Sequence, residues 1–336
     1  MRAFVVTEPG LSAVREWSDP TASTDEVLVR PLLAGMCGTD LELIDGTIDP
    51  AYVKYPLVLG HEWVGALEGD SAVGRDGAHV VVEGVIPCGQ CEECLQGDSN
   101  LCGTYDEIGF TRAGAIAERV SVPTKLVHRL SDDVELDDAV LVEPMAVVWR
   151  ALTRLPLRPR LRVAIVGDGT IALLAAHLVC LFNPSRVTVI GRRDEQRELA
   201  IRAGADEFLI ETPALTFDLV IEAAGNAAAV TSALGLCARG AMVILLGLPP
   251  HGTRVEIAPD DLVNNDVIIQ ASFSYTRKAF ADVVARLNAK ELRPSFLITH
   301  RFALEDATNA VAALRGGADE EPRGKVVVEI VEIVER

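Results

Sequence analysis

The stretch 162–172, with the sequence RVAIVGDGTIA, limits the possible folds more than any other part of the chain. The apolar residues 163–166 predict a short strand buried on both faces, because such parallel strands lose the alternation of apolar and polar residues. Gly167, Gly169 and Ala172 then fit the pattern G-x-G-x-x-G/A at the start of an apolar helical segment. This pattern makes a tight turn that brings a pyrophosphate to a helix N-terminus, where anions are favoured. The alternative is an ordinary strand-to-helix turn.

Strands and helices continue to alternate after this turn. The stretches 186–190, 217–225, 241–248 and 266–273 each predict a further strand, with helical segments between them. Repeated strand–helix units predict a parallel, doubly wound sheet whose ligand lies at the carboxyl ends of the strands. The expected fold class is therefore α/β.

Length and charge restrict the class of protein further. A chain of 336 residues, 49% hydrophobic and 24% charged, predicts about two globular domains. A net charge of −18 argues against a nucleic-acid partner, whose phosphates would be repelled. No apolar run is long enough for a transmembrane helix, and the N-terminus lacks the features of a signal peptide. We therefore expect a cytoplasmic enzyme without a membrane or nucleic-acid partner.

Four of the seven cysteines are clustered with the spacing C-x2-C-x2-C-x7-C: Cys88, Cys91, Cys94 and Cys102. In a cytoplasmic chain the thiols stay reduced, so a cluster indicates metal rather than disulfides. Four thiolates can close tetrahedrally on one Zn²⁺ and leave no position for substrate, which predicts a structural zinc. An iron–sulfur cluster is disfavoured by the spacing. A zinc ribbon for nucleic-acid contact is disfavoured by the negative charge.

Three other segments carry side chains that can bind a metal. They contain Cys37 in a loop before a short helix, His61 with Glu62 after an apolar run, and Glu143 before a proline. Each also has a purely structural explanation: a small buried cysteine, a surface histidine and a carboxylate at a helix start.

Taken in order, the loop 35–40, Gly60-His61-Glu62, the four-cysteine lobe, Glu143-Pro144 and the turn at Gly167 resemble the zinc-dependent medium-chain dehydrogenases, the alcohol and polyol dehydrogenase superfamily. The resemblance covers essentially the whole chain. It implies a GroES-like, mostly β catalytic domain at 1–147 and 277–336 and a Rossmann domain at 148–276. It also implies two zinc ions per subunit and a homodimer or homotetramer.

The resemblance assigns a catalytic zinc to Cys37, His61 and Glu143, with one position open for water or a substrate oxygen. Glu62 would lie beside the zinc or act as an alternate ligand. Thr39 would hydrogen-bond the reacting oxygen and pass its proton outward. The relay often ends in a histidine, but here that position is Glu42, which departs from the alcohol, sorbitol and threonine dehydrogenases and resembles the glucose dehydrogenases. Glu42 could itself accept the proton.

Cofactor-binding residues also follow from the resemblance. At the end of the strand 186–190, Gly191 stands where NAD enzymes often carry an acidic residue for the ribose, and Arg192 and Arg193 come next. A guanidinium can hold the 2′-phosphate of NADP with two hydrogen bonds, so NADP is favoured. The alternative is that the two arginines are solvated and that Asp194 binds the ribose of NAD. The further expected contacts are Gly167, Gly169, Thr170, Ile171, Gly225, Gly247, Leu248, Phe273 and, near the pyrophosphate, Lys325.

We therefore expect a zinc- and NADP-dependent oxidoreductase that transfers hydride from a secondary alcohol or hemiacetal carbon of a sugar, polyol or cyclitol. The loop 109–114 is expected to approach the substrate. Alternatives are a glucose-type aldose 1-dehydrogenase, a deoxy-inosamine-type cyclitol dehydrogenase and a threonine dehydrogenase, the last disfavoured by Glu42. Zinc-free quinone reductases are disfavoured because every zinc-ligand position is filled. From a different class, an inactive binding homologue is the remaining alternative.

Overall fold

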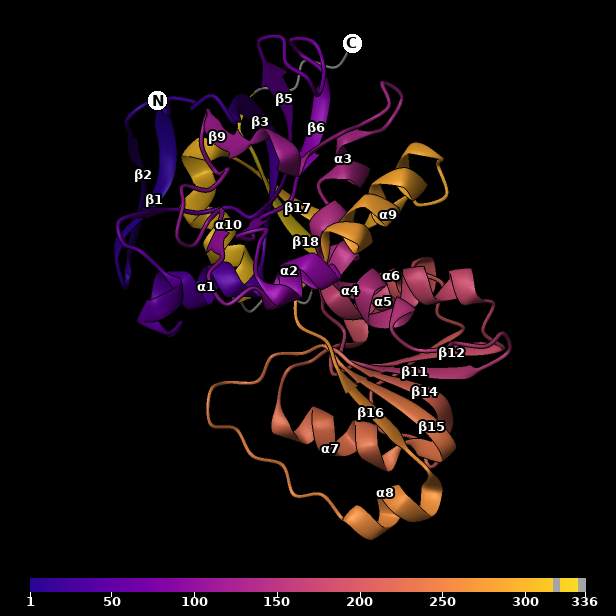
Figure 1. Ribbon diagram of the computed structural model, residues 1–336. Helices are drawn as coiled ribbons and strands as arrows, with labels where there is room; N and C mark the ends of the chain where they lie inside the picture. Colours follow the sequence, from indigo (N-terminus) through magenta and orange to yellow (C-terminus); the bar gives the residue numbers. More distant parts are fainter. Residues whose placement is uncertain (317–320, 332–336) are drawn as a thin grey trace. The chain divides into compact units, whose positions relative to one another are not determined.

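The computed structural model describes residues 1–316 and 321–331 (Figure 1). It divides the chain into two compact units. The first contains Met1–Glu143, Thr276–Asp319 and Lys325–Arg336, and the second contains Pro144–Tyr275 and Glu320–Gly324. The unit boundaries therefore fall after 143 and 275, where the sequence analysis places domain boundaries after 147 and 276. The segment 320–324, expected in the first domain, groups with the second unit because Gln196 hydrogen-bonds Arg323.

The first unit is mostly β. Its main sheet has the order β10-β6-β5-β3-β18-β17, with β9 also paired to β3, and its pairs are antiparallel except β17 with β18. The strands are β3 (Glu26–Met36), β5 (Glu62–Glu68), β6 (His79–Val82), β9 (Val120–Pro123), β10 (Val127–Arg129), β17 (Ile298–Ala303) and β18 (Lys325–Glu329). A smaller sheet contains β1 (Arg2–Glu8), β2 (Leu11–Glu16) and β4 (Leu57–Val58). A two-stranded sheet contains β7 (Val85–Ile86) and β8 (Asp106–Glu107).

Short helices accompany these sheets: α1 (Gly38–Asp45), α2 (Glu92–Gln96), α3 (Leu136–Ala139), α9 (Arg277–Asn288) and α10 (Ala307–Arg315). One apolar core joins the strands to α1 and α10, with Phe4, Met36, Leu43 and Trp63 among its buried members. Burial of these side chains fixes the loops that leave β3 and precede β5, because both loops begin or end inside the core. Those loops carry Cys37 and His61.

The second unit contains a six-stranded parallel sheet with the order β13-β12-β11-β14-β15-β16. Its strands are β11 (Arg162–Val166), β12 (Arg186–Ile190), β13 (Glu207–Leu209), β14 (Phe217–Glu222), β15 (Cys237–Leu245) and β16 (Ile268–Ala271). Its helices are α4 (Val142–Thr153), which starts in the first unit, α5 (Thr170–Val179), α6 (Arg197–Arg202), α7 (Ala227–Gly235) and α8 (Pro259–Asn265).

Helices lie on both faces of this sheet, with α5 and α6 on one side and α7 and α8 on the other (Figure 1). The strand order reverses between β11 and β14, and such a switch point is where doubly wound sheets bind their ligand. The predicted α/β class, with a mostly β unit and a doubly wound parallel unit, is confirmed. Within the described residues, no helix has the length and apolar character needed to cross a bilayer.

Candidate functional site

Cys37 lies at the junction between β3 and α1, where it is the N-cap residue of the helix. Its backbone N–H donates to Asp40 Oδ2 at 2.8 Å, so the side chain of the third helical residue closes the loop. Asp40 is completely buried. The sulfur position is therefore set by a rigid helix start rather than by a free loop.

His61 lies just before β5 and is also buried. Its Nδ1 is 3.5 Å from Asp40 Oδ1, and its ring is 5.3 Å from the Phe110 ring. Burial lowers the pKa of His61, but the charge of Asp40 and its contact with Cys37 raise this pKa well above the usual value. Asp40 thus holds Cys37 by a hydrogen bond and lies within ion-pair distance of His61. A carboxylate on one ring nitrogen orients a histidine so that its other nitrogen can bind a metal.

Glu62, the first residue of β5, completes a metal-binding cluster. Ligand atoms of Cys37, His61 and Glu62 all lie within 4.8 Å of one another. A thiol, an imidazole and a carboxylate at this separation fit one Zn²⁺ with room for a further ligand. The cluster is the first of two groups of this kind among the described residues.

Lys325, the first residue of β18, ion-pairs with Glu62, and both side chains are 2% exposed. Strands β5 and β18 flank β3, and Gly35 of β3 lies between the two side chains. A Cβ at Gly35 would lie 2.7 Å from Lys325 Cε and 2.8 Å from Glu62 Oε2. The glycine therefore makes the space in which the ion pair forms.

Lys325 is the residue expected near the cofactor pyrophosphate. In the structure its buried ammonium pairs with Glu62 of the metal-binding cluster. Burial lowers the pKa of Lys325, and the charges of Glu62, Cys37 and Glu143 raise it above the usual value. The ammonium therefore offsets the negative charge of these ligand side chains.

Glu143, the expected third ligand, is not one of the three residues within 4.8 Å. It is the second residue of α4 and lies beside the cluster. Burial and the charge of Glu62 raise its pKa to about 8, while His61 and Lys325 lower it. The structure thus supplies two carboxylates, Glu62 and Glu143, for one remaining ligand position.

Thr39 and Glu42 follow Cys37 on the first turns of α1. The Cys37 thiol donates to Thr39 Oγ1 at 3.7 Å, which brings the hydroxyl to the cluster. Glu42 is half-buried, and burial raises the pKa of its carboxyl. Thr39 and Glu42 are three residues apart on α1, a spacing that puts two side chains on one face of a helix.

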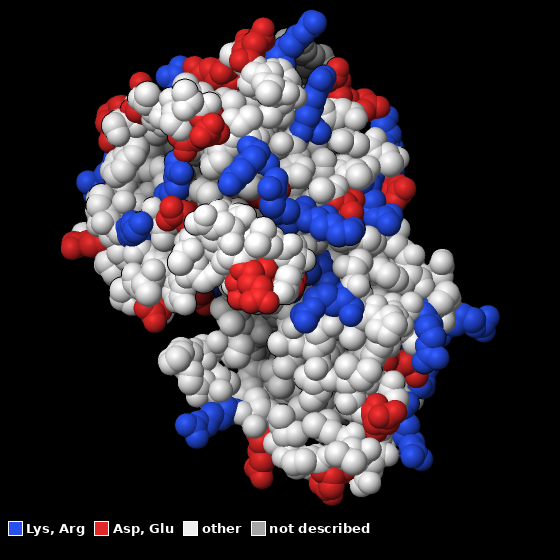
Figure 2. Space-filling model, viewed as in Figure 1, with Lys and Arg blue, Asp and Glu red and all other residues white. Residues whose placement is uncertain are grey.

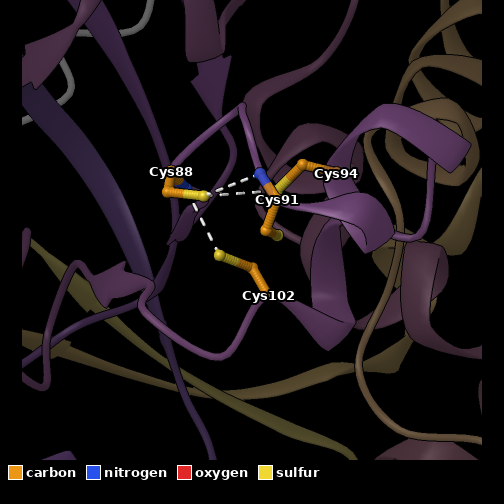
Figure 3. Close-up of side chains that lie close together, drawn as sticks. All are labelled: Cys88, Cys91, Cys94 and Cys102. Atoms are coloured by element: carbon orange, nitrogen blue, oxygen red, sulfur yellow. Dashed lines mark hydrogen bonds between the residues drawn. The ribbon is translucent and has the colours of Figure 1, made fainter.

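Four cysteines form the second metal-binding group (Figure 3). Their ligand atoms lie within 4.8 Å of one another, and all four thiols are free. The N–H of Cys91 donates to Cys88 Sγ, and the N–H of Cys88 donates to Cys102 Sγ, each at 3.4 Å. Backbone N–H groups of Gln90 and Cys91 lower the pKa of Cys88 to about 6. Reduced, converging thiols with N–H donors fit a closed zinc site.

The glycine turn follows β11 in the second unit. Gly167 has φ of +131°, and a Cβ there would lie 3.0 Å from the Ala223 carbonyl carbon. Gly169 is the N-cap of α5, and a Cβ on it would meet nothing within 4 Å. The first glycine thus packs against β14, and the second leaves open space before the helix N-terminus. That space fits an approaching phosphate.

Other expected cofactor residues lie beyond the carboxyl ends of the strands. Gly225 and Gly247 pack together after β14 and β15, since a Cβ on Gly247 would lie 2.2 Å from the Gly225 nitrogen. Leu248 and Phe273, after β15 and β16, are 72% and 55% exposed. Thr170, the first residue of α5, donates from Oγ1 to the Gly324 carbonyl at 2.8 Å.

Comparison with known proteins gives the family. Residues 23–132 match the alcohol dehydrogenase GroES-like domain, and residues 136–330 match the glucose dehydrogenase C-terminus. The chain is 28% identical to sorbitol dehydrogenase of Bacillus subtilis (strain 168), over 87% of each chain. It is 30% identical to L-threonine 3-dehydrogenase of the same strain, over 94% of this chain and 96% of the relative.

A solved structure extends the similarity to the whole fold. A zinc-binding dehydrogenase from Sinorhizobium meliloti 1021, bound to NADP, has a TM-score of 0.90 at 28% identity. The alignment covers 98% of this chain and 99% of that one. The chain belongs to the zinc-dependent alcohol and polyol dehydrogenases. The expected GroES-like and Rossmann folds are thereby confirmed.

In this dehydrogenase, the two arginines after β12 have different environments. Arg193 donates to Asp168 Oδ1 from Nε at 3.2 Å and from Nη2 at 2.8 Å. Asp168 Oδ2 also accepts the backbone N–H groups of Arg192 and Arg193, at 2.8 and 3.1 Å. Among the described residues, no ion pair or side-chain hydrogen bond is made by the exposed Arg192. Arg193 is therefore held by the glycine turn, and Arg192 is available to a ligand.

Gly191 itself cannot carry an acidic side chain in this dehydrogenase. A Cβ there would lie 2.6 Å from Phe208 Cζ and 2.7 Å from Asp168 Cβ. Asp168 thus fills the space that a side chain at 191 would occupy. Sequence reasoning noted the missing carboxylate but did not find the one that the turn supplies.

Sequence reasoning also missed Glu107, the last residue of β8. Burial raises the pKa of Glu107 to about 7, and the charge of His61 lowers it, which places its carboxylate near the metal-binding cluster. The segment 106–110, with the sequence DEIGF, offered a signal: a carboxylate directly before an apolar turn. The loop expected to approach the substrate, 109–114, begins two residues after Glu107.

Proposed function

We propose that this dehydrogenase oxidises a secondary alcohol or hemiacetal carbon of a sugar, polyol or cyclitol and that it prefers NADP⁺. The observation that carries this proposal is the position of the Thr39 hydroxyl 3.7 Å from Cys37 Sγ, beside His61 and Glu62. The carboxylates of Glu42 and Glu107 add hydrogen-bond acceptors suited to a substrate with several hydroxyls. The similarity to sorbitol dehydrogenase supports this substrate class.

The chain's own residues hold the reacting groups and move the proton. When bound, zinc supplies polarisation of the substrate oxygen and the nicotinamide supplies the hydride acceptor. Cys37 and His61 are proposed as ligands, with Glu143 as the third and Glu62 as the alternate. Thr39 Oγ1 takes the hydroxyl proton of the substrate and passes its own proton toward Glu42. Burial raises the pKa of Glu42, which makes its carboxylate a better proton acceptor.

The preference for NADP⁺ is supported by the surroundings of β12. Gly191 has no room for a ribose-binding acid, and the exposed Arg192 can form a bidentate contact with a 2′-phosphate. Gly167, Gly169, Ile171, Gly225, Gly247, Leu248 and Phe273 are proposed to line the rest of the cofactor site. Asp194 is the residue on which NAD⁺ would depend in the alternative.

A substrate panel tests the function. Sugars, inositols and polyols are supplied with NADP⁺ and with NAD⁺, and the absorbance of the reduced cofactor is followed. We expect reduction of NADP⁺ with at least one polyhydroxylated substrate and a content of two zinc ions per subunit. A zinc-loaded enzyme that reduces neither cofactor with any member of the panel contradicts the proposal.

Threonine dehydrogenase is the second candidate. It is favoured by the relative of that activity, which is 30% identical over 94% of this chain. L-Threonine therefore belongs in the panel. Turnover of L-threonine far above that of every sugar and polyol would select this alternative.

We further propose that the enzyme forms a homodimer or homotetramer and acts in the cytoplasm. Among the described strands, β16 lies at the edge of its sheet and pairs with β15, and its Ile268 and Ile269 are 49% and 37% exposed. An apolar edge strand is a common site of strand pairing between subunits. Light scattering after size-exclusion chromatography measures the oligomeric state, and cell fractionation tests the location.

A further inference from the structure

The segment 321–324 lies against the glycine turn of the second unit through a buried glutamine. Gln196 is completely buried, and its amide nitrogen donates to the Asp168 carbonyl at 2.6 Å and to the Arg323 carbonyl at 2.8 Å. Its amide oxygen accepts the backbone N–H of Arg323 at 2.7 Å. Thr170 adds a hydrogen bond to the Gly324 carbonyl. Two donors and one acceptor of a single amide thus join three parts of the chain.

These hydrogen bonds fix the backbone of Arg323 next to the end of β12. An amide provides both donors and an acceptor, whereas a glutamate or an aliphatic residue at 196 would leave buried backbone groups without partners. Gln196 immediately precedes α6 and follows Arg192 and Arg193 by a few residues. The return segment is therefore part of the same corner of the sheet as the two arginines.

Arg323 is close enough to this corner for its charge to interact with both members of the Asp168–Arg193 pair. Burial and the charge of Arg193 lower the pKa of Arg323, while Asp168 and Glu195 raise it. The guanidinium groups of Arg193 and Arg323 are therefore neighbours, with the carboxylates of Asp168 and Glu195 beside them. A dianionic ligand would relieve the repulsion between neighbouring guanidinium groups.

We propose that Arg323 is a further cation for the 2′-phosphate of NADP and that Gln196 is the residue that positions it. Arg192 provides the exposed fork, Arg193 is held by Asp168, and Arg323 approaches from the return segment. The inference rests on the NADP⁺ preference proposed above and adds a residue from outside the β12 turn. Cofactor choice is then set jointly by two segments that are far apart in the sequence.

The experiment compares the wild-type enzyme with Arg323→Ala, Arg323→Lys and Gln196→Met. Calorimetry measures the Kd of adenosine 2′,5′-bisphosphate and of adenosine 5′-monophosphate, and kinetics give kcat and KM for NADP⁺ and NAD⁺. Arg239→Ala serves as the matched control, because Arg239 is an exposed arginine of the same unit in the first half of β15. Melting temperature and zinc content establish that each variant is folded.

For Arg323→Ala we expect the Kd of the bisphosphate and the KM of NADP⁺ to rise about 10- to 100-fold, the usual effect of losing a charged hydrogen bond. Binding of the monophosphate, the KM of NAD⁺ and kcat should stay at wild-type values. Arg323→Lys should recover part of the loss. Gln196→Met should likewise raise the Kd of the bisphosphate relative to that of the monophosphate, and the KM of NADP⁺ relative to that of NAD⁺. Arg239→Ala should change neither ratio.

Two results would contradict the inference, and they differ in whether the NADP⁺ preference is contradicted as well. A wild-type enzyme that binds the bisphosphate no more tightly than the monophosphate overturns both the NADP⁺ preference and the role of Arg323. A wild-type preference that Arg323→Ala leaves intact overturns the role of Arg323 alone. Equal losses for NADP⁺ and NAD⁺ would likewise assign Arg323 and Gln196 a purely structural role.

Discussion

Asp40 determines the geometry of the metal-binding cluster although it is not one of its three members. One carboxylate oxygen accepts the N–H of Cys37, and the other lies 3.5 Å from His61 Nδ1. The same side chain therefore sets the start of α1 and the orientation of the imidazole. Groups of this kind typically contribute 10- to 100-fold to metal affinity or activity.

We expect Asp40→Asn to weaken zinc binding at the cluster and to lower kcat/KM, each by about 10- to 100-fold, because the neutral amide no longer orients and polarises His61. Chelator competition and steady-state kinetics measure the two effects. Asp45→Asn is the control, since Asp45 lies on the same helix but pairs with Arg315 at the surface. Unchanged zinc affinity in Asp40→Asn would contradict this assignment.

Glu62 and Glu143 are expected to respond differently to loss of charge. Glu143→Gln should remove the catalytic zinc and leave about one zinc per subunit, because its carboxylate is the proposed third ligand. Glu62→Gln should retain both ions but lower the stability by about 3–5 kcal/mol, because the buried ammonium of Lys325 loses its partner. Metal analysis and thermal unfolding separate the two outcomes. The reverse pattern of zinc loss would identify Glu62 as the ligand.

At the scale of elements, the glycine turn is the connection between β11 and α5 that also fixes the end of β12. The carboxylate of Asp168 in this turn accepts hydrogen bonds from the side chain and the backbone N–H of Arg193, which follows the end of β12. Burial raises the pKa of Asp168, but the contact with Arg193 and the backbone N–H groups lower it below its usual value. A lowered folded-state pKa means that stabilisation is present above the unfolded pKa of about 3.9 and is lost as pH falls through the folded value.

We therefore expect Asp168→Asn to lower the melting temperature of the cofactor-free enzyme near neutral pH, by an amount that corresponds to about 2 kcal/mol. The difference from wild type should begin to shrink as the pH falls below about 4, where the carboxyl becomes protonated in the unfolded chain, and should be lost once Asp168 is also protonated in the folded enzyme. Asp194→Asn is the control, since the Asp194–Arg197 pair lies at the surface and surface pairs contribute little. A difference that is constant with pH would exclude the charge of Asp168 as the cause.

Local patterns were enough to predict the elements that carry chemistry. The glycine turn and the four-cysteine lobe each occupy a short stretch, so their spacing in the sequence already fixes their geometry. The contacts of Lys325 with Glu62 and of Gln196 with Arg323 were not predictable in this way. They depend on which strands become neighbours and on the space that Gly35 leaves, and a single sequence contains no direct record of either.

The order in which motifs occur also limited the prediction. It indicated the family and therefore suggested Glu143 as a ligand and Lys325 as a cofactor contact. It did not predict that the side chain of Lys325 pairs with Glu62. That contact depends on the pairing of β18 with β3, in which Val327 lies opposite Gly35 and the Lys325 side chain reaches the space beside this glycine.

At the scale of the whole molecule, the proposed assembly into oligomers has to overcome a net charge of −18, and Figure 2 shows acidic and basic side chains spread over one face of the protein. Charge repulsion between subunits favours contact through uncharged surface. Strand β16, with the sequence IIQA, supplies such surface, and its Ile268 and Ile269 are partly exposed.

We expect Ile268→Lys to convert the oligomer into smaller species, because a charge on the edge strand blocks strand pairing. Light scattering after size-exclusion chromatography measures the mass. Ile201→Lys is the control, since Ile201 is an exposed isoleucine on α6 of the same unit. An unchanged mass for Ile268→Lys would place the interface elsewhere.

The ion pair across Gly35 has a consequence for the order of events during biosynthesis. Cys37, His61 and Glu62 are made early, but the ammonium that offsets their charge comes with β18, more than 260 residues later in the chain. The four-cysteine lobe, in contrast, is complete within fifteen consecutive residues. On a ribosome, the lobe can therefore assemble while the chain is still growing, whereas the ion pair at the other cluster forms only after β18 has emerged from the exit tunnel.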